Sequence, residues 1–108
     1  MAIIIDVETI DPTGGPNLPS GVFITFDTKL YAGTTNVHFM LYYYRSKSAF
    51  LASKQRISAP TDCNLLSFEK RNIDPSVYIA LNATSLHDIV RDEIETYIGT
   101  GNASIDLT

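Results

Sequence analysis

Apolar and polar side chains alternate along the first part of the chain with a period of two residues, which is typical of β-strands. Residues 2–10 and 22–31 form the first two such segments, and on one face the first carries Ile3, Ile5 and Val7. Residues 11–21, between them, hold three prolines and three glycines and cannot form a helix or a central strand. The sequence therefore predicts an N-terminal strand on a semi-rigid arm (residues 1–20) that folds back or reaches a neighbouring subunit.

The strongest strand pattern covers residues 36–45, where both faces are apolar or amphipathic. A strand with one face in water should carry polar residues on that face. We therefore expect this strand to be covered on both sides, by a helix, a second sheet or another molecule. Weaker strand patterns follow at residues 49–57, 65–71, 76–82 and 103–107.

One amphipathic helix is predicted over residues 86–98, because apolar residues recur there at spacings of three and four. Ser85 is a suitable N-cap, and Gly99 a suitable left-handed residue after the helix. About seven strands and one C-terminal helix indicate a mainly β fold. The predicted architecture is an antiparallel β-sandwich or rolled barrel, formed by a single domain over residues 1–108.

Composition narrows the class of protein. The chain has 108 residues, of which 44% are hydrophobic and 19% charged, as in one globular domain. No apolar run approaches the roughly 20 residues of a membrane span, and the N-terminus lacks the features of a signal peptide. We therefore expect synthesis and folding in the cytoplasm and no membrane partner. A net charge of −4 weighs against nucleic acid as a partner.

The charges are segregated along the chain. Residues 29–61 contain five basic and no acidic residues, whereas residues 1–28 contain only acids and residues 72–108 contain six acids and one base. These runs are either solvated faces or the two ends of a bipolar surface. A bipolar surface would suit a head-to-tail contact between identical copies, which joins two different patches of one chain.

No constellation for catalysis or metal binding is apparent. His38 and His87 lie outside any spaced cluster of ligands, and the single cysteine, Cys63, follows an acidic residue that disfavours a reactive thiolate. We therefore expect no enzymatic activity, no metal and no cofactor. A pocket that joined His38 to a carboxylate such as Asp27 would reopen the question.

The run Tyr42-Tyr43-Tyr44-Arg45 is the most distinctive surface candidate. Tyrosine and arginine are enriched at the centres of protein interfaces. Tyr42 and Tyr44 could instead cap the core, or stack nucleobases as in small barrels that bind single strands. The predicted interface therefore combines the N-terminal strand with the tyrosine run, namely Ile3, Ile5, Val7, Tyr42, Tyr44, Arg45 and Lys47. The alternative is a small β-domain that binds a carbohydrate or single-stranded nucleic acid through Tyr42, Tyr44, Arg45 and Lys47.

Three features together resemble the small virion proteins of tailed bacteriophages, such as neck, tail-completion, tail-tube and baseplate components. They are the N-terminal segment Met1–Ile10, the connector Asp11–Ser20 and the helix over 86–98. The resemblance implies a non-enzymatic structural protein, made in the host cytoplasm and incorporated into the virion. It would assemble as a homo-oligomer or with other virion proteins, through exchanged arms and augmented sheet edges.

Overall fold

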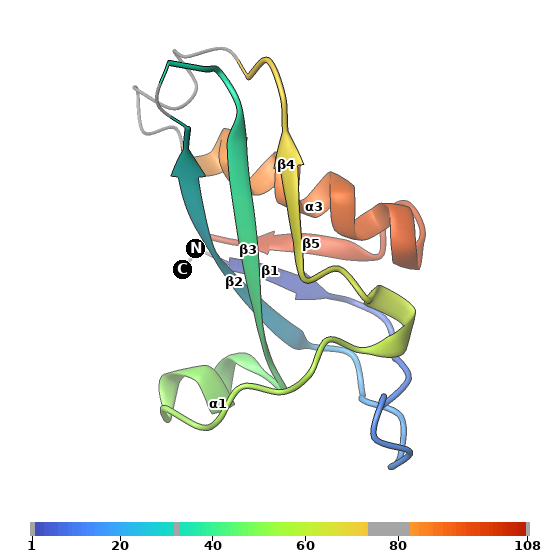
Figure 1. The fold of residues 1–108 in the computed structure, drawn as a ribbon. Coiled ribbons are helices and arrows are strands. Elements are labelled where there is room, and N and C mark those ends of the chain that lie inside the picture. Colours follow the sequence, from blue (N-terminus) through green and yellow to red (C-terminus); the bar gives the residue numbers. More distant parts are fainter. Residues whose placement is uncertain (1, 32, 74–82, 108) are drawn as a thin grey trace.

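The structure is a computed structural model that describes residues 2–31, 33–73 and 83–107. Its centre is one antiparallel sheet with the strand order β4-β3-β2-β1-β5 (Figure 1). The strands are β1 (Ala2–Ile5), β2 (Val22–Leu30), β3 (Val37–Tyr44), β4 (Ser67–Lys70) and β5 (Ala103–Asp106). The mainly β, antiparallel class predicted from the sequence is confirmed.

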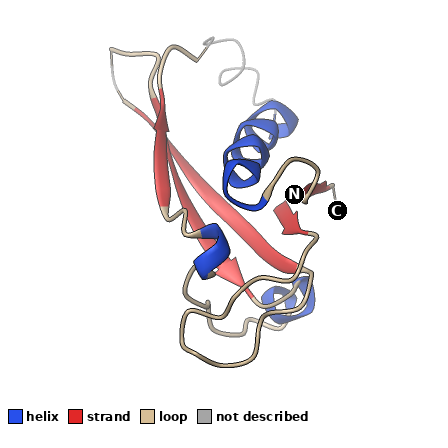
Figure 2. Cartoon of the chain, turned by 90° about the vertical axis from the view of Figure 1, so that its right-hand side faces the viewer, coloured by secondary structure: helices blue, strands red, loops and turns tan. Residues whose placement is uncertain are grey.

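Helices lie on both sides of this sheet. The long helix α3 (Ala83–Ile98) packs along one face (Figure 2), and the short helix α1 (Lys47–Leu51) lies against one end of the opposite face, where Phe50 contacts Phe23 and Tyr44. A single 3-10 turn, η1 (Thr61–Cys63), contacts α3. Among the described residues, helices therefore cover one face of the sheet along its length and the other face at one end.

The main core lies between the sheet and α3. Phe39 and Ile24 from the central strands are fully buried, as are Val90 and Ile94 on the apolar stripe of α3. The Phe39 ring also stacks on Phe68 of β4, with ring centroids 4.7 Å apart. These residues share one face because side chains alternate along each strand.

The N-terminal strand lies inside the sheet and is not free. β1 pairs with β2 on one side and with β5 on the other, and Ile3 and Ile5 are fully buried under α3. The expectation that this strand adds to the sheet of a neighbouring subunit is therefore wrong for this structure. Its hydrogen-bonding edges and its apolar face are already used within the chain.

The Pro/Gly connector closes back on the body and does not reach outward. Thr9 and Leu18 form an antiparallel bridge, with N–O distances of 2.9 and 2.6 Å in its two hydrogen bonds. The amide of Gly21 then donates to the carbonyl of Ile5 at 2.7 Å. Of the two alternatives for the arm, the structure supports the one in which it folds onto its own domain. The strand predicted over 2–10 accordingly ends at Ile5.

The strand predicted over 49–57 is also wrong. Lys47–Leu51 is helical, and the Ser46 side chain caps this helix by accepting a hydrogen bond from the Ala49 amide at 3.0 Å. The strand predicted over 76–82 lies outside the described residues. The described strands form one open sheet, so the seven-stranded sandwich or barrel is not confirmed.

The C-terminal predictions agree more closely with the structure. The helix begins at Ala83, three residues before the predicted start, and ends at Ile98 as predicted. Gly99 follows it with a φ of 97°, which is the left-handed conformation expected there. β4 and β5 lie within the predicted ranges 65–71 and 103–107.

Packing of α3 on the sheet predicts a strong effect of truncating Ile94. The Ile94→Ala variant should lose about 2–5 kcal/mol of unfolding free energy, because the change leaves a cavity among fully buried side chains. Leu66→Ala, at a site 61% exposed, is the control and should change stability by no more than about 0.5 kcal/mol. Urea denaturation followed by circular dichroism measures both, and equal losses would contradict the packing described.

Candidate functional site

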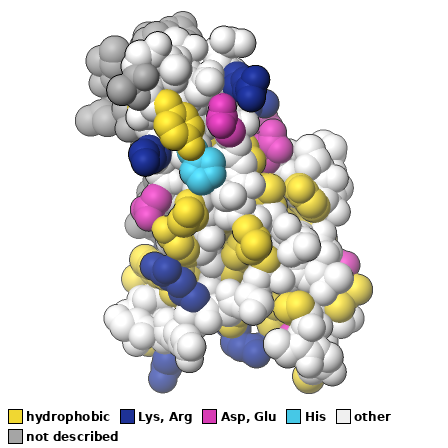
Figure 3. All heavy atoms as spheres, viewed as in Figure 1, with side chains coloured by type: hydrophobic (Ala, Val, Ile, Leu, Met, Phe, Trp, Pro, Cys, Tyr) yellow, Lys and Arg dark blue, Asp and Glu magenta, His cyan; other side chains and the backbone are white. Residues whose placement is uncertain are grey.

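The sheet face that points away from α3 is the first candidate site, and we call it the open face. Strand register places on it Ile4 of β1, Phe23 and Asp27 of β2, and Met40, Tyr42 and Tyr44 of β3. Figure 3 looks onto this face, where hydrophobic side chains alternate with charged ones. At its lower end, near α1, the charged side chains in view are mostly Lys and Arg (Figure 3).

An aromatic cluster holds α1 against one end of the open face. The Phe50 ring of α1 lies 5.1 Å from the ring of Phe23 and 5.0 Å from that of Tyr44, between ring centroids. Both Phe23 and Tyr44 are buried as a result. This small second core fixes α1 in place although the helix has only five residues.

A network of polar contacts occupies the middle of the open face. The Tyr42 hydroxyl donates to the Asp27 carboxylate at 2.9 Å, and the Arg56 guanidinium carbon lies 3.9 Å from the centroid of the Tyr42 ring. Arg56 Nε also donates to the Tyr44 hydroxyl at 3.1 Å. The hydrogen bond to Asp27 raises the pKa of Tyr42, because ionised Tyr42 could no longer donate it. Desolvation and the negative charge of Asp27 raise this pKa further.

One large apolar side chain on the open face is not covered: Met40, at the centre of β3, is 44% exposed. Strand register places the polar residues Thr25, Lys29 and His38 on the same face. A sheet face in water normally carries polar side chains at such positions. Exposed Met and aromatic side chains next to arginine are characteristic of protein interfaces.

The structure separates the residues that the sequence grouped as one interface. Tyr42 and Tyr44 lie on the open face, with Tyr44 largely buried by α1. Lys47 is close by and forms an ion pair with Asp106 of β5 at 2.9 Å. Ile3 and Ile5 belong to the α3 core, and Val7 lines a groove at the other side of the molecule.

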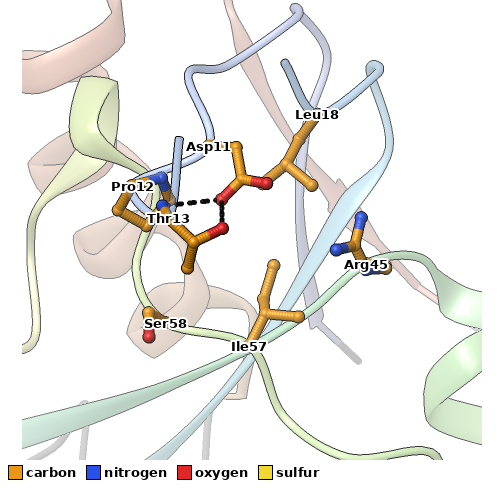
Figure 4. Close-up of a pocket in the computed structure, with 7 residues that line it drawn as sticks. All are labelled: Asp11, Pro12, Thr13, Leu18, Arg45, Ile57 and Ser58. Carbon is orange, nitrogen blue, oxygen red and sulfur yellow. Dashed lines mark hydrogen bonds between the residues drawn. The ribbon is translucent and has the colours of Figure 1, made fainter. Parts of the chain in front are cut away.

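Arg45 lies apart from the tyrosines, at a cavity of about 130 Å³. Figure 4 shows Arg45 on one side of this cavity and Asp11 and Thr13 toward the other, with Leu18 and Ile57 also in its lining. Thr13 donates two hydrogen bonds to Asp11, from its hydroxyl and from its amide, and together with the charge of Arg45 these lower the pKa of Asp11. Of the four residues predicted to bind a ligand, Arg45 lines this cavity, whereas Tyr42 and Tyr44 lie on the open face.

A second, larger groove of about 340 Å³ lies beside the C-terminal end of α3. Its apolar lining comes from Val7, Tyr97 and Ile98, and its polar lining from Glu8, Asp62 and Asn102. Two of these six residues are acidic and none is basic. We call it the acidic groove.

Sequence reasoning places Arg56 in a strand near the tyrosine run, and the structure brings its guanidinium onto Tyr42 and Tyr44. It does not predict the contact of Asp27 with Tyr42, and it gives no role to Phe50. The cap at Ser46 was the signal that could have revealed α1, and with it the position of Phe50 and Arg56.

Strand register places Asp27 and His38 on the open face, on neighbouring strands. Asp27 is bonded to Tyr42, and neither Asp27 nor His38 lines the cavity or the groove described above. Cys63 is buried, which raises the pKa of its thiol. In the part of the chain that the structure describes, no group of three metal-ligating side chains is found. No helix within the described ranges is long and apolar enough to span a bilayer.

Comparisons with protein-family models, with curated proteins and with solved structures found no match to this chain.

The contact between Tyr42 and Asp27 predicts an abnormal tyrosine titration. Tyr42 should ionise above the ordinary pKa of about 10, because Asp27 disfavours the tyrosinate. Asp27→Asn removes that charge and should return the ionisation toward the ordinary range. Ultraviolet absorbance of tyrosinate during alkaline titration detects the shift, with Tyr42→Phe identifying the residue. Superimposable curves for the wild type and Asp27→Asn would rule the contact out.

Proposed function

We propose that this chain is a non-enzymatic structural protein that assembles with further copies of itself. The open face together with α1 is one of its contact surfaces. The observation that carries this proposal is the unequal covering of the sheet. α3 buries one face along its length, whereas on the other face Met40 is exposed beside the Tyr42, Asp27 and Arg56 contacts.

Charge supports a second copy of the chain as the occupant of this surface. The α1 end is basic, with Lys54 and Arg56 exposed there, whereas α3 carries on its accessible positions Asp88, Asp92, Glu93 and Glu95. A basic, aromatic surface fits an acidic one. Because both surfaces belong to this chain, identical copies can supply each other's partner.

We further propose that the assembly belongs to a tailed-phage virion, as a neck, tail or baseplate component. The support is the resemblance of the N-terminal segment, the connector and the C-terminal helix in sequence. Strand exchange is not part of this proposal, because β1 pairs within its own sheet. Contacts between surfaces of folded subunits take its place.

Light scattering at increasing protein concentration tests the proposal. We expect the mass to rise above the 11.9 kDa of one chain and to fall back in high salt, because charged surfaces contribute to the contact. A mass that stays at one chain over the whole concentration range would exclude self-assembly.

Met40→Gln tests the open face specifically. Removing a methionine side chain from a buried contact should weaken self-association by about 1–2 kcal/mol, which is roughly fivefold to thirtyfold in the dissociation constant. Leu66→Gln changes a more exposed apolar residue that precedes β4, and it should leave association unchanged. Sedimentation equilibrium of both variants measures the difference. Equal effects would show that the open face has no special role.

A further inference from the structure

The turn after α1 forms a rigid projection that is both apolar and basic. Leu51 is 68% exposed, and Lys54 is exposed three residues later. The backbone between them is held by hydrogen bonds from the amides of Ala52, Ser53 and Lys54 to carbonyls of α1. Phe50 anchors the helix on the sheet, so the projection is fixed before any partner arrives.

The acidic groove has the complementary chemistry. Tyr97, which is 49% exposed, and Ile98 give it an apolar wall, and the carboxylates of Glu8 and Asp62 lie in the same lining. Both carboxylates accept a hydrogen bond from another residue of the same chain. Glu8 accepts a hydrogen bond from the Asn17 amide group at 3.0 Å, and Asp62 accepts one from the Ile10 backbone amide at 3.2 Å. The groove is therefore also formed in advance.

The projection and the groove lie on opposite sides of the molecule. In Figure 1, α1 is at the lower left, whereas the C-terminal end of α3 and the segment that follows β1 are at the right. A projection on one side cannot reach a groove on the other side of the same chain. Two different surfaces on opposite sides are the requirement for a head-to-tail contact that repeats from copy to copy.

We propose that the projection of one copy docks into the acidic groove of the next. Leu51 packs against Val7, Tyr97 and Ile98, and Lys54 lies near Glu8 and Asp62. This inference rests on the proposed self-assembly and adds two surfaces that contribute to it besides the open face. Because each docked copy still offers a free projection and a free groove, repetition gives a ring or a filament.

Two variants that each damage one surface test the proposal. Leu51→Ala/Lys54→Ala removes the projection. Glu8→Gln/Tyr97→Ala weakens the groove, while the glutamine keeps an oxygen for Asn17. Each variant alone should associate at least tenfold more weakly than the wild type. An equimolar mixture should form a complex of two chains and nothing larger, because one intact projection meets one intact groove.

Light scattering of the two variants and of their mixture gives the result. Arg71→Ala removes an exposed basic side chain just after β4 and serves as the matched control, which should assemble like the wild type. The two-chain complex also demonstrates that both variants are folded. If a double variant does not fold, Lys54→Ala and Glu8→Gln replace the pair.

The contradicting outcomes are distinct. A wild type that remains a monomer overturns both this inference and the proposed function. A wild type that assembles while both variants assemble equally well overturns the docking alone. A wild type that stops at a dimer, or a mixture that gains no mass, likewise excludes head-to-tail docking of these two surfaces and leaves self-assembly intact.

Discussion

The fold depends on the pairing of β1 with both β2 and β5. This strand joins the beginning of the chain to its end, since Ala2 lies opposite Asp106 and Ile5 opposite Ala103. It also contributes Ile3 and Ile5 to the core beneath α3. Without β1, β5 would have no neighbouring strand in the sheet, and α3 would lose its packing contacts with Ile3 and Ile5. The strand that the sequence predicted to pair with a neighbouring subunit is therefore required for the fold of its own chain.

This arrangement makes the two faces of the sheet unlike each other. α3 has an apolar stripe long enough to cover the strands, whereas α1 has five residues and covers only the aromatic end. The tyrosines of β3 consequently lie on both faces of the sheet. Tyr43 points into the core, where burial raises the pKa of its hydroxyl, while Tyr42 lies on the open face with Asp27 and Arg56. The proposed assembly surface is thus the part of the sheet that α1 leaves exposed.

The sequence predicted the elements whose patterns are local. Alternation located β2 and β3, and the apolar stripe with Gly99 located α3. It failed where long-range contacts decide. The Thr9–Leu18 bridge turns the connector inward, and the contacts of Phe50 with Phe23 and Tyr44 stabilise a helix in a segment with strand-like alternation. Arg45 is adjacent to the tyrosine run in sequence, whereas Arg56 is eleven residues further on. The fold nevertheless brings Arg56 to Tyr44 and places Arg45 at the cavity.

Hydrogen–deuterium exchange in dilute and concentrated solution tests the central claim most directly. The account predicts that amides of β1 are already protected in the dilute monomer, and that concentration adds protection only around β3, the α1 turn and the acidic groove. Protection of β1 that appears only on assembly would contradict it, because the strand would then be exchanged between copies.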